Sequence, residues 1–82
     1  MITIKELAEL GQKYNLDIEL EAGHPDFVFL RKYDAYLKYG ATLLVPLKEF
    51  TEDPKAVLKS CSEIMELKIY QQYLKRDKLD KL

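Results

Sequence analysis

The chain has 82 residues, of which 48% are hydrophobic and 33% are charged, and its formal net charge is −1. This composition excludes a disordered segment, and the lack of a run of about 18 apolar residues excludes a membrane span. We therefore expect one globular domain over residues 1–82. The first residues do not have the layout of a signal peptide, which favours a cytoplasmic location.

Cysteine and histidine each occur once, as Cys61 and His24. A lone cysteine cannot form an internal disulfide bond, and one Cys with one His cannot supply the four ligands of a zinc site. No motif has the spacing of a catalytic or cofactor site. We expect no cofactor and no metal ion, and nothing in the sequence indicates a small-molecule ligand.

A helix is predicted over residues 4–14. Thr3 and Glu6 have the spacing of a capping box, which marks the start of a helix. Asn15 can adopt the left-handed conformation that ends one. Gly11 lies inside this helix at a cost of about 1 kcal/mol relative to alanine, which indicates that another backbone segment passes close to it.

Residues 16–22 alternate strictly between apolar and acidic side chains. A period of two predicts a half-buried β-strand, with its acidic side chains on the outer face. These acidic residues are Asp17, Glu19 and Glu21.

A β-hairpin should follow this strand. Residues 23–26 have turn chemistry, and the apolar residues 27–30 suit a paired strand. A four-residue turn sets Leu20 opposite Phe29 on the core face and Asp17 opposite Lys32 on the outer face.

A third strand is predicted around residues 43–45, with Pro46 at its end, where a missing N–H does least harm. The turn before it falls either at Asp34-Ala35 or at Tyr39-Gly40. Both alternatives give a three-stranded antiparallel meander.

The last element is a long helix over residues 54–76, capped by Thr51 or Asp53 and with Pro54 in its first turn. At 100° per residue, one broad apolar stripe should cover the sheet. That stripe consists of Val57, Leu58, Cys61, Ile64, Met65 and Ile69, with Tyr73 at its edge. The helix is about 34 Å long and a seven-residue strand about 23 Å, so the last helical turns should extend past the sheet.

These elements together predict an α+β fold with the order helix, three-stranded antiparallel β-meander, long C-terminal helix. This order resembles that of the double-stranded RNA-binding domain over most of the chain. That family carries a basic cluster at the start of its second helix, where this chain has only Lys55 and Lys59 after two acidic residues. We do not expect a nucleic-acid partner.

A second apolar stripe on the long helix consists of Leu67, Tyr70 and Leu74, roughly opposite the first. Two interpretations are open. The first helix could pack against these side chains, or they could form a surface for self-association or for a protein partner. Full burial of three such side chains contributes on the order of 5 to 8 kcal/mol, comparable to the total stability of a small domain.

Residues 31–39 interleave tyrosines with basic residues. This combination can stack bases and neutralise phosphates, but it is also ordinary edge-strand composition. We take Tyr33, Tyr36 and Tyr39 as a second candidate contact surface.

The row of Asp17, Glu19 and Glu21 offers an alternative function. A regular acidic face could mimic nucleic acid and occupy the basic groove of an enzyme, as small phage-type inhibitors do. One strand face supplies only about half the charge density of a DNA strand, because alternate residues are about 6.7 Å apart. A solvated sheet face is the better explanation of the row.

Catalysis is not expected. His24-Pro25-Asp26 is the tripeptide of J-domain co-chaperones, but its flanks, an acidic strand and an apolar strand, favour a hairpin turn. Cys61 lies on the core-facing stripe, where a buried thiol is inert. The sequence thus predicts a small non-catalytic module that acts through homodimerisation or a protein partner. The alternative is an inhibitor or regulator of a nucleic-acid-processing enzyme.

Overall fold

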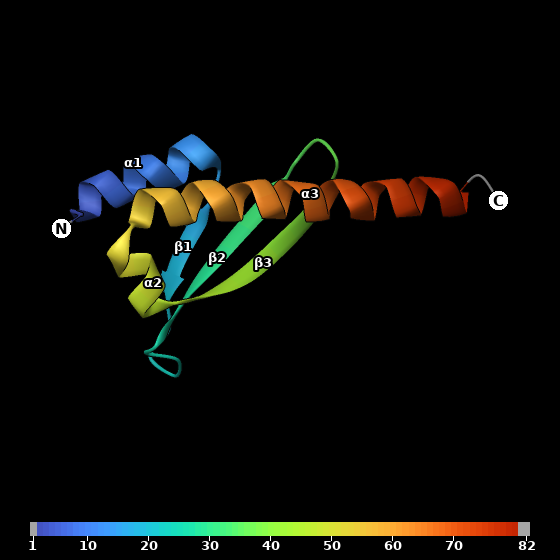
Figure 1. Ribbon diagram of the computed structural model, residues 1–82. Helices are drawn as coiled ribbons and strands as arrows, with labels where there is room; N and C mark the ends of the chain where they lie inside the picture. Colours follow the sequence, from blue (N-terminus) through green and yellow to red (C-terminus); the bar gives the residue numbers. More distant parts are fainter. Residues whose placement is uncertain (1, 81–82) are drawn as a thin grey trace.

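A computed structural model describes residues 2–80 and places the helices on one face of a three-stranded sheet (Figure 1). The elements follow in the order α1 (Ile4–Tyr14), β1 (Asp17–Leu20), β2 (Phe27–Asp34), β3 (Tyr39–Pro46), α2 (Leu47–Glu52) and α3 (Pro54–Asp80). Both strand pairs are antiparallel, and the strand order is β1-β2-β3. The predicted α+β order of helix, meander and long helix is confirmed.

Both ends of α1 are formed by the residues that the sequence indicated. The side chain of Thr3 accepts a hydrogen bond from the backbone N–H of Glu6 at 3.1 Å. Asn15 ends the helix in the left-handed conformation, with φ of 53°. A Cβ on Gly11 would lie 2.9 Å from the carbonyl oxygen of Leu16, so the expected close backbone approach is present.

The predicted register of the first hairpin is wrong by one residue. Leu20 lies opposite Val28, and Asp17 lies opposite Arg31. A shift of one residue exchanges the two faces of a strand. As a result Val28, Leu30 and Lys32 point to the helices, and all three are buried. Phe29, which was expected in the core, faces the open side of the sheet.

The wider connection between β1 and β2 accounts for this difference. The strands are joined by residues 21–26 and not by a four-residue turn. The N–H of His24 donates to the carbonyl of Glu21 at 3.0 Å, and the N–H of Phe27 donates to the carbonyl of His24 at 3.2 Å. The His24 ring packs edge-on against Phe29, with centroids 5.6 Å apart, and so covers part of that ring on the open face.

The second hairpin turns at residues 35–38, between the two predicted alternatives, Asp34-Ala35 and Tyr39-Gly40. One carboxylate oxygen of Asp34 accepts hydrogen bonds from the N–H groups of Tyr36 and Leu37, each at 2.9 Å. Lys38 completes the turn with φ of 63°, in the left-handed region.

A short helix, α2, was not expected and turns the chain from the sheet to α3. It buries Phe50 against the core. Asp53 then caps α3, because its carboxylate accepts a hydrogen bond from the N–H of Ala56 at 3.2 Å. The hydrophobic core lies between α3 and the sheet and consists of Leu16, Val28, Leu30, Val45, Phe50, Leu58 and Met65.

Helix α3 reaches well past the sheet. Its 27 residues give a length of about 40 Å, whereas the eight-residue strands β2 and β3 span about 27 Å. In Figure 1 the C-terminal part of α3 continues beyond the β2–β3 turn without a neighbouring element. The described part of the molecule is accordingly 50 Å long and 18 Å thick.

Candidate protein-binding surface

Over residues 54–78, helix α3 carries five exposed large apolar side chains, which are Ile64, Leu67, Tyr70, Tyr73 and Leu74. The prediction that Ile64 belongs to the stripe that covers the sheet is wrong, because this side chain is 48% exposed. We call Leu67, Tyr70 and Leu74 the α3 outer stripe. The exposed fraction is 58% for Leu67, 49% for Tyr70 and 39% for Leu74. Helix α1 does not cover them, because it lies beside the N-terminal half of α3 (Figure 1). Of the two interpretations of this stripe, packing by α1 is therefore wrong.

An aromatic pair extends the α3 outer stripe toward the sheet. The rings of Tyr70 and Tyr73 stack with centroids 6.3 Å apart and an interplanar angle of 30°. Tyr73 in turn lies over the β2–β3 turn, where it shares a shallow pocket with Leu37 and Tyr39. The pair lies against the turn on one side and is exposed on the other, which makes it an aromatic candidate for a contact.

Charged side chains surround the α3 outer stripe. Glu63, Lys68 and Lys75 are exposed on the same helix. An apolar centre with a charged rim is the composition of a protein contact surface, in which the apolar anchors supply affinity and the charges orient the partner.

The three tyrosines of the second candidate surface do not come together. Tyr33 is exposed on the open face of the sheet, and Tyr36 lies at the tip of the β2–β3 turn. Tyr39 is half-buried on the helix side, close to Tyr73. They are therefore not one surface, although Tyr39 lies next to the aromatic pair on α3.

An apolar patch on the open face of the sheet was missed at the sequence level. Register places Phe29 opposite Leu44 and Phe27 opposite Pro46, so these four side chains are neighbours on that face. Phe27 and Leu44 are exposed. The signal was present in the apolar run 27–30, but the off-by-one register assigned its phenylalanines to the core.

The acidic row lies on the open face with a basic residue beside it. The guanidinium group of Arg31 is 3.5 Å from a carboxylate oxygen of Glu19 and 4.0 Å from one of Glu21. Asp17 lies opposite Arg31 in the strand pairing. The row therefore surrounds a positive charge and presents a weaker negative field than three unpaired carboxylates.

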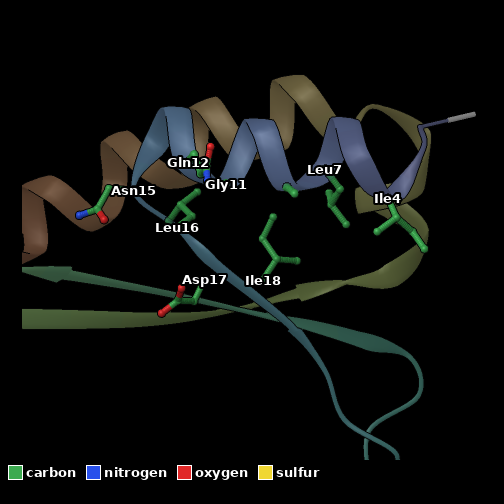
Figure 2. Close-up of a pocket in the computed structure, with 9 residues that line it drawn as sticks. Ile4, Leu7, Gly11, Gln12, Asn15, Leu16, Asp17 and Ile18 are labelled. Carbon is green, nitrogen blue, oxygen red and sulfur yellow. The ribbon is translucent and has the colours of Figure 1, made fainter.

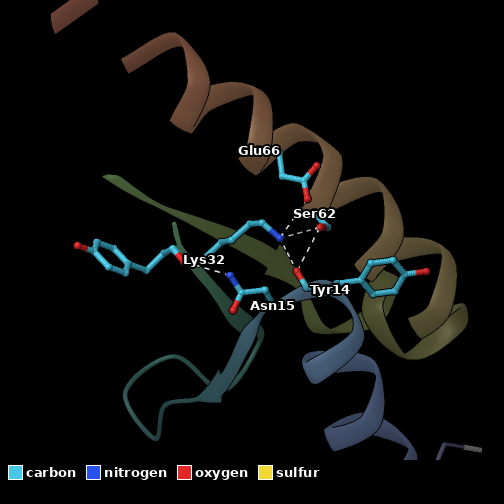
Figure 3. Close-up of polar contacts among 6 residues, drawn as sticks. Tyr14, Asn15, Lys32, Ser62 and Glu66 are labelled. Atoms are coloured by element: carbon cyan, nitrogen blue, oxygen red, sulfur yellow. Dashed lines mark hydrogen bonds and ion pairs between the residues drawn. The ribbon is translucent and has the colours of Figure 1, made fainter. Parts of the chain in front are cut away.

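Lys32 is the one basic residue of β2 that points into the protein, and it joins three elements (Figure 3). Its ammonium group donates to the backbone carbonyl of Tyr14 and to the hydroxyl of Ser62, the latter at 3.1 Å, and lies 3.3 Å from a carboxylate oxygen of Glu66. Each of its donors has a partner, which is what a buried cation requires. We interpret this cluster as structural.

Cys61 is one of the titratable side chains among residues 2–80, and its pKa is shifted. Cys61 is half-buried, and burial raises the pKa of its thiol, with a further contribution from the carboxylate of Glu49. A raised pKa lowers the fraction of thiolate, which is the reactive form. The same residues contain no group of acidic, cysteine and histidine side chains placed to hold a metal ion. In this range no helix has the length and apolar character needed to cross a membrane.

A groove of about 590 Å³ separates α1 from the edge strand β1 (Figure 2). Apolar side chains of Ile4, Leu7 and Ile18 line it together with the polar side chains of Gln12, Asn15 and Asp17. It is open to solvent along its length, and no titratable pair converges in it.

No protein-family model matches the chain, and neither curated proteins nor solved structures show significant similarity to it.

Proposed function

We propose that this chain is a small, non-catalytic protein-binding module and that the α3 outer stripe is its contact surface. The observation that supports the proposal is the exposure of Leu67, Tyr70 and Leu74 on a helix that extends past the sheet. These side chains contribute little to the core of the monomer, which lies on the opposite side of α3.

The apolar side chains of the stripe supply part of the binding energy of a contact. They are already about half-buried, so covering the rest contributes on the order of 2 to 4 kcal/mol, and the surrounding contacts supply the remainder. Tyrosine is enriched among the residues that dominate binding energy, and Tyr70 is already held by its stacking on Tyr73.

The helical spacing indicates the type of contact. Residues at i, i+3 and i+7 on one helix face are the anchors used when a helix docks into an apolar groove of another protein. Leu67, Tyr70 and Leu74 have that spacing. We therefore expect a protein partner, either another polypeptide or a second copy, that offers a groove for α3.

Mimicry of nucleic acid ranks second. Three carboxylates lie on the open face, but Arg31 lies against two of them. Direct binding of nucleic acid ranks below it, because the basic residues of 31–38 do not share a face: Arg31 points outward, and Lys32 is buried.

Photo-crosslinking in the native host cells tests the proposal. A benzophenone amino acid replaces Tyr70, and in a matched control it replaces Lys59, an exposed position on the same helix. We expect one discrete adduct from position 70, none from position 59, and loss of the adduct when Leu67→Asp is added. The mass of the adduct tells a second copy from another polypeptide.

Equal labelling from both positions, or an adduct that survives Leu67→Asp, would refute a contact at the α3 outer stripe. Circular dichroism of Leu67→Asp controls for folding. Because Leu67 is exposed, its helical signal should match that of the unmodified chain.

A further inference from the structure

The structure has a second unpartnered feature, the outer edge of β3. We infer that two copies of this chain pair along β3 in antiparallel orientation, with the two-fold axis at Leu43, and form one six-stranded sheet. The occupant of the edge is thus a second copy. This contact is independent of the α3 outer stripe, which it leaves accessible.

The direction of the backbone groups on β3 follows from three hydrogen bonds. The carbonyl of Gly40 accepts from the side-chain amide of Gln72 at 3.1 Å, and the carbonyl of Tyr33, its partner on β2, accepts from the side-chain amide of Asn15 at 3.0 Å. The two carbonyls therefore point away from each other. Just beyond the other end of β3, the N–H of Leu47 donates to the backbone carbonyl of Asp26 at 2.7 Å.

Antiparallel pairing alternates between hydrogen-bonded and non-hydrogen-bonded pairs. With Tyr33 and Gly40 as a non-bonded pair, residues 41, 43 and 45 bond to β2. Thr42 and Leu44 then direct both their N–H and C=O groups to the outer edge. Among residues 2–80 no strand pairs with β3 on that side.

The two edges of the sheet differ in protection. Strand β1 has four residues, two of them acidic. Strand β3 has eight residues, and none of residues 39–46 is charged. Folded proteins usually shorten, charge or cover an exposed edge, because a long apolar edge pairs with other strands. Strand β1 is short and charged, whereas β3 is neither, and α3 reaches the β3 edge with the bond from Gln72 to the Gly40 carbonyl.

The β3 edge is complementary to itself. With Leu43 on the two-fold axis, Thr42 of one copy lies opposite Leu44 of the other, and each such pair exchanges two N–H···O=C bonds. The next pair joins Gly40 to Pro46. Proline has no N–H to donate, and the carbonyl of Gly40 that would receive it is already bonded to Gln72. Pro46 lacks a donor and the Gly40 carbonyl is already occupied, so this pair leaves no hydrogen-bonding backbone group without a partner.

The side chains beside this edge are also compatible with a second copy. On the helix side, a groove of about 390 Å³ runs between β3 and α3 and is lined mainly by apolar side chains, including Leu43, Val45, Val57 and Cys61. In the paired arrangement the two Leu43 side chains meet at the mouth of this groove. The formal net charge of −1 adds little repulsion between copies.

The paired arrangement places the two copies of α3 antiparallel on the same face of the joined sheet. Their C-terminal turns then extend from opposite ends of the dimer. If the α3 outer stripe binds a partner, the dimer presents two such sites, and avidity for a repeated or dimeric partner follows.

Sedimentation velocity of the full chain tests the inference. We expect a dimer at about 100 µM and a dissociation constant raised by about tenfold or more in Thr42→Pro. The proline removes an N–H that faces the outer edge, so the monomer keeps its β2–β3 bonds. The matched control is Leu20→Pro, whose N–H faces the outer edge of β1. It should leave the dimer unchanged.

A crosslinking experiment gives a readout that does not depend on a proline. In a Cys61→Ala background, Leu43→Cys should form a disulfide-linked dimer with oxidised glutathione, because residues directly opposite in a non-bonded pair have Cα atoms about 4.5 Å apart. Ala41→Cys is the control. Its two copies would lie about 13 Å apart along the strands, beyond the reach of a disulfide bond.

A chain that stays monomeric at this concentration would overturn the inference, as would equal crosslinking at positions 41 and 43. A dimer that resists Thr42→Pro but is lost with Leu67→Asp and Tyr70→Asp would also overturn it, since the copies would then meet through α3.

Discussion

The ammonium group of Lys32 donates a hydrogen bond to the backbone carbonyl of Tyr14, the last residue of α1. The last carbonyls of a helix lack partners within the helix and carry the negative end of its dipole. A cation at this position satisfies one of them. It also joins the middle strand to α1, while Ser62 extends the contact to α3. One side chain thus fixes the arrangement of both long helices on the sheet.

Replacement of this cation should destabilise the protein. Lys32→Met keeps most of the buried volume but leaves the Tyr14 carbonyl with only the weaker bond from Ser62, at 3.4 Å. We expect the free energy of unfolding to fall by about 1 to 3 kcal/mol, measured by urea denaturation. Arg31→Met, on the open face, is the control and should change it by less than about 1 kcal/mol. Equal losses in both variants would contradict the role of Lys32.

Gly11→Ala should also cost stability, although alanine is the better helix former by about 1 kcal/mol. The new Cβ would lie 2.9 Å from the backbone oxygen of Leu16, which cannot move without displacing β1. We expect a net loss of about 1 to 2 kcal/mol in thermal or urea unfolding. At Gly23 nothing lies within 4 Å of the new Cβ, so Gly23→Ala should be nearly neutral. A stabilised Gly11→Ala variant would show that the contact is loose.

The thiol of Cys61 should react slowly with Ellman's reagent. Burial, and secondarily the charge of Glu49, raises its pKa, so at about pH 8 it holds less thiolate than an exposed cysteine. The rate should rise as the pH increases toward the raised pKa. Glu49→Gln removes the smaller cause and should increase the rate modestly. A rate equal to that of a free cysteine would contradict the placement of this side chain.

Hydrogen exchange should divide α3 into two parts. Amides near the buried residues Leu58 and Met65 open only with the core, whereas those after Asp77 lie beyond the last α3 residue that lines the pocket at the β2–β3 turn. We expect residues 78–80 to exchange much faster than residues 58–65 in the isolated protein. Uniform protection along α3 would contradict the extended geometry.

The fold was predictable from local chemistry. The capping box at Thr3, the left-handed residue Asn15 and the cap at Asp53 each satisfy backbone groups of a neighbouring helix end, so their effect depends on a few residues only. The existence of three strands likewise followed from alternation and from turn residues.

The register could not be obtained in the same way. In the run Phe27-Val28-Phe29-Leu30 both faces are apolar, so the period of two does not select the face that is buried. Tertiary contacts make the selection. Lys32 finds its partners on α1 and α3, and the His24 ring covers Phe29 on the open face. Neither contact leaves a signal in the sequence of β2 itself.

The candidate surfaces were predictable only where one helix carries them. The spacing of Leu67, Tyr70 and Leu74 places them on one side of α3 without knowledge of the sheet. Surfaces built from several strands depend on register. For that reason the sequence missed the Phe27–Phe29–Leu44 patch and grouped Tyr33 with Tyr39, which lie on opposite faces.

The central claim is that Leu67, Tyr70 and Leu74 form a contact surface for another protein and are not needed for the fold of the monomer. The most direct test is the free energy of unfolding of the chain with all three residues changed to alanine, measured by urea denaturation at a concentration where it is monomeric. The account predicts a change below about 1.5 kcal/mol, since exposed substitutions each cost about 0.5 kcal/mol or less. A loss of about 4 kcal/mol or more, the cost of removing buried side chains, would contradict it.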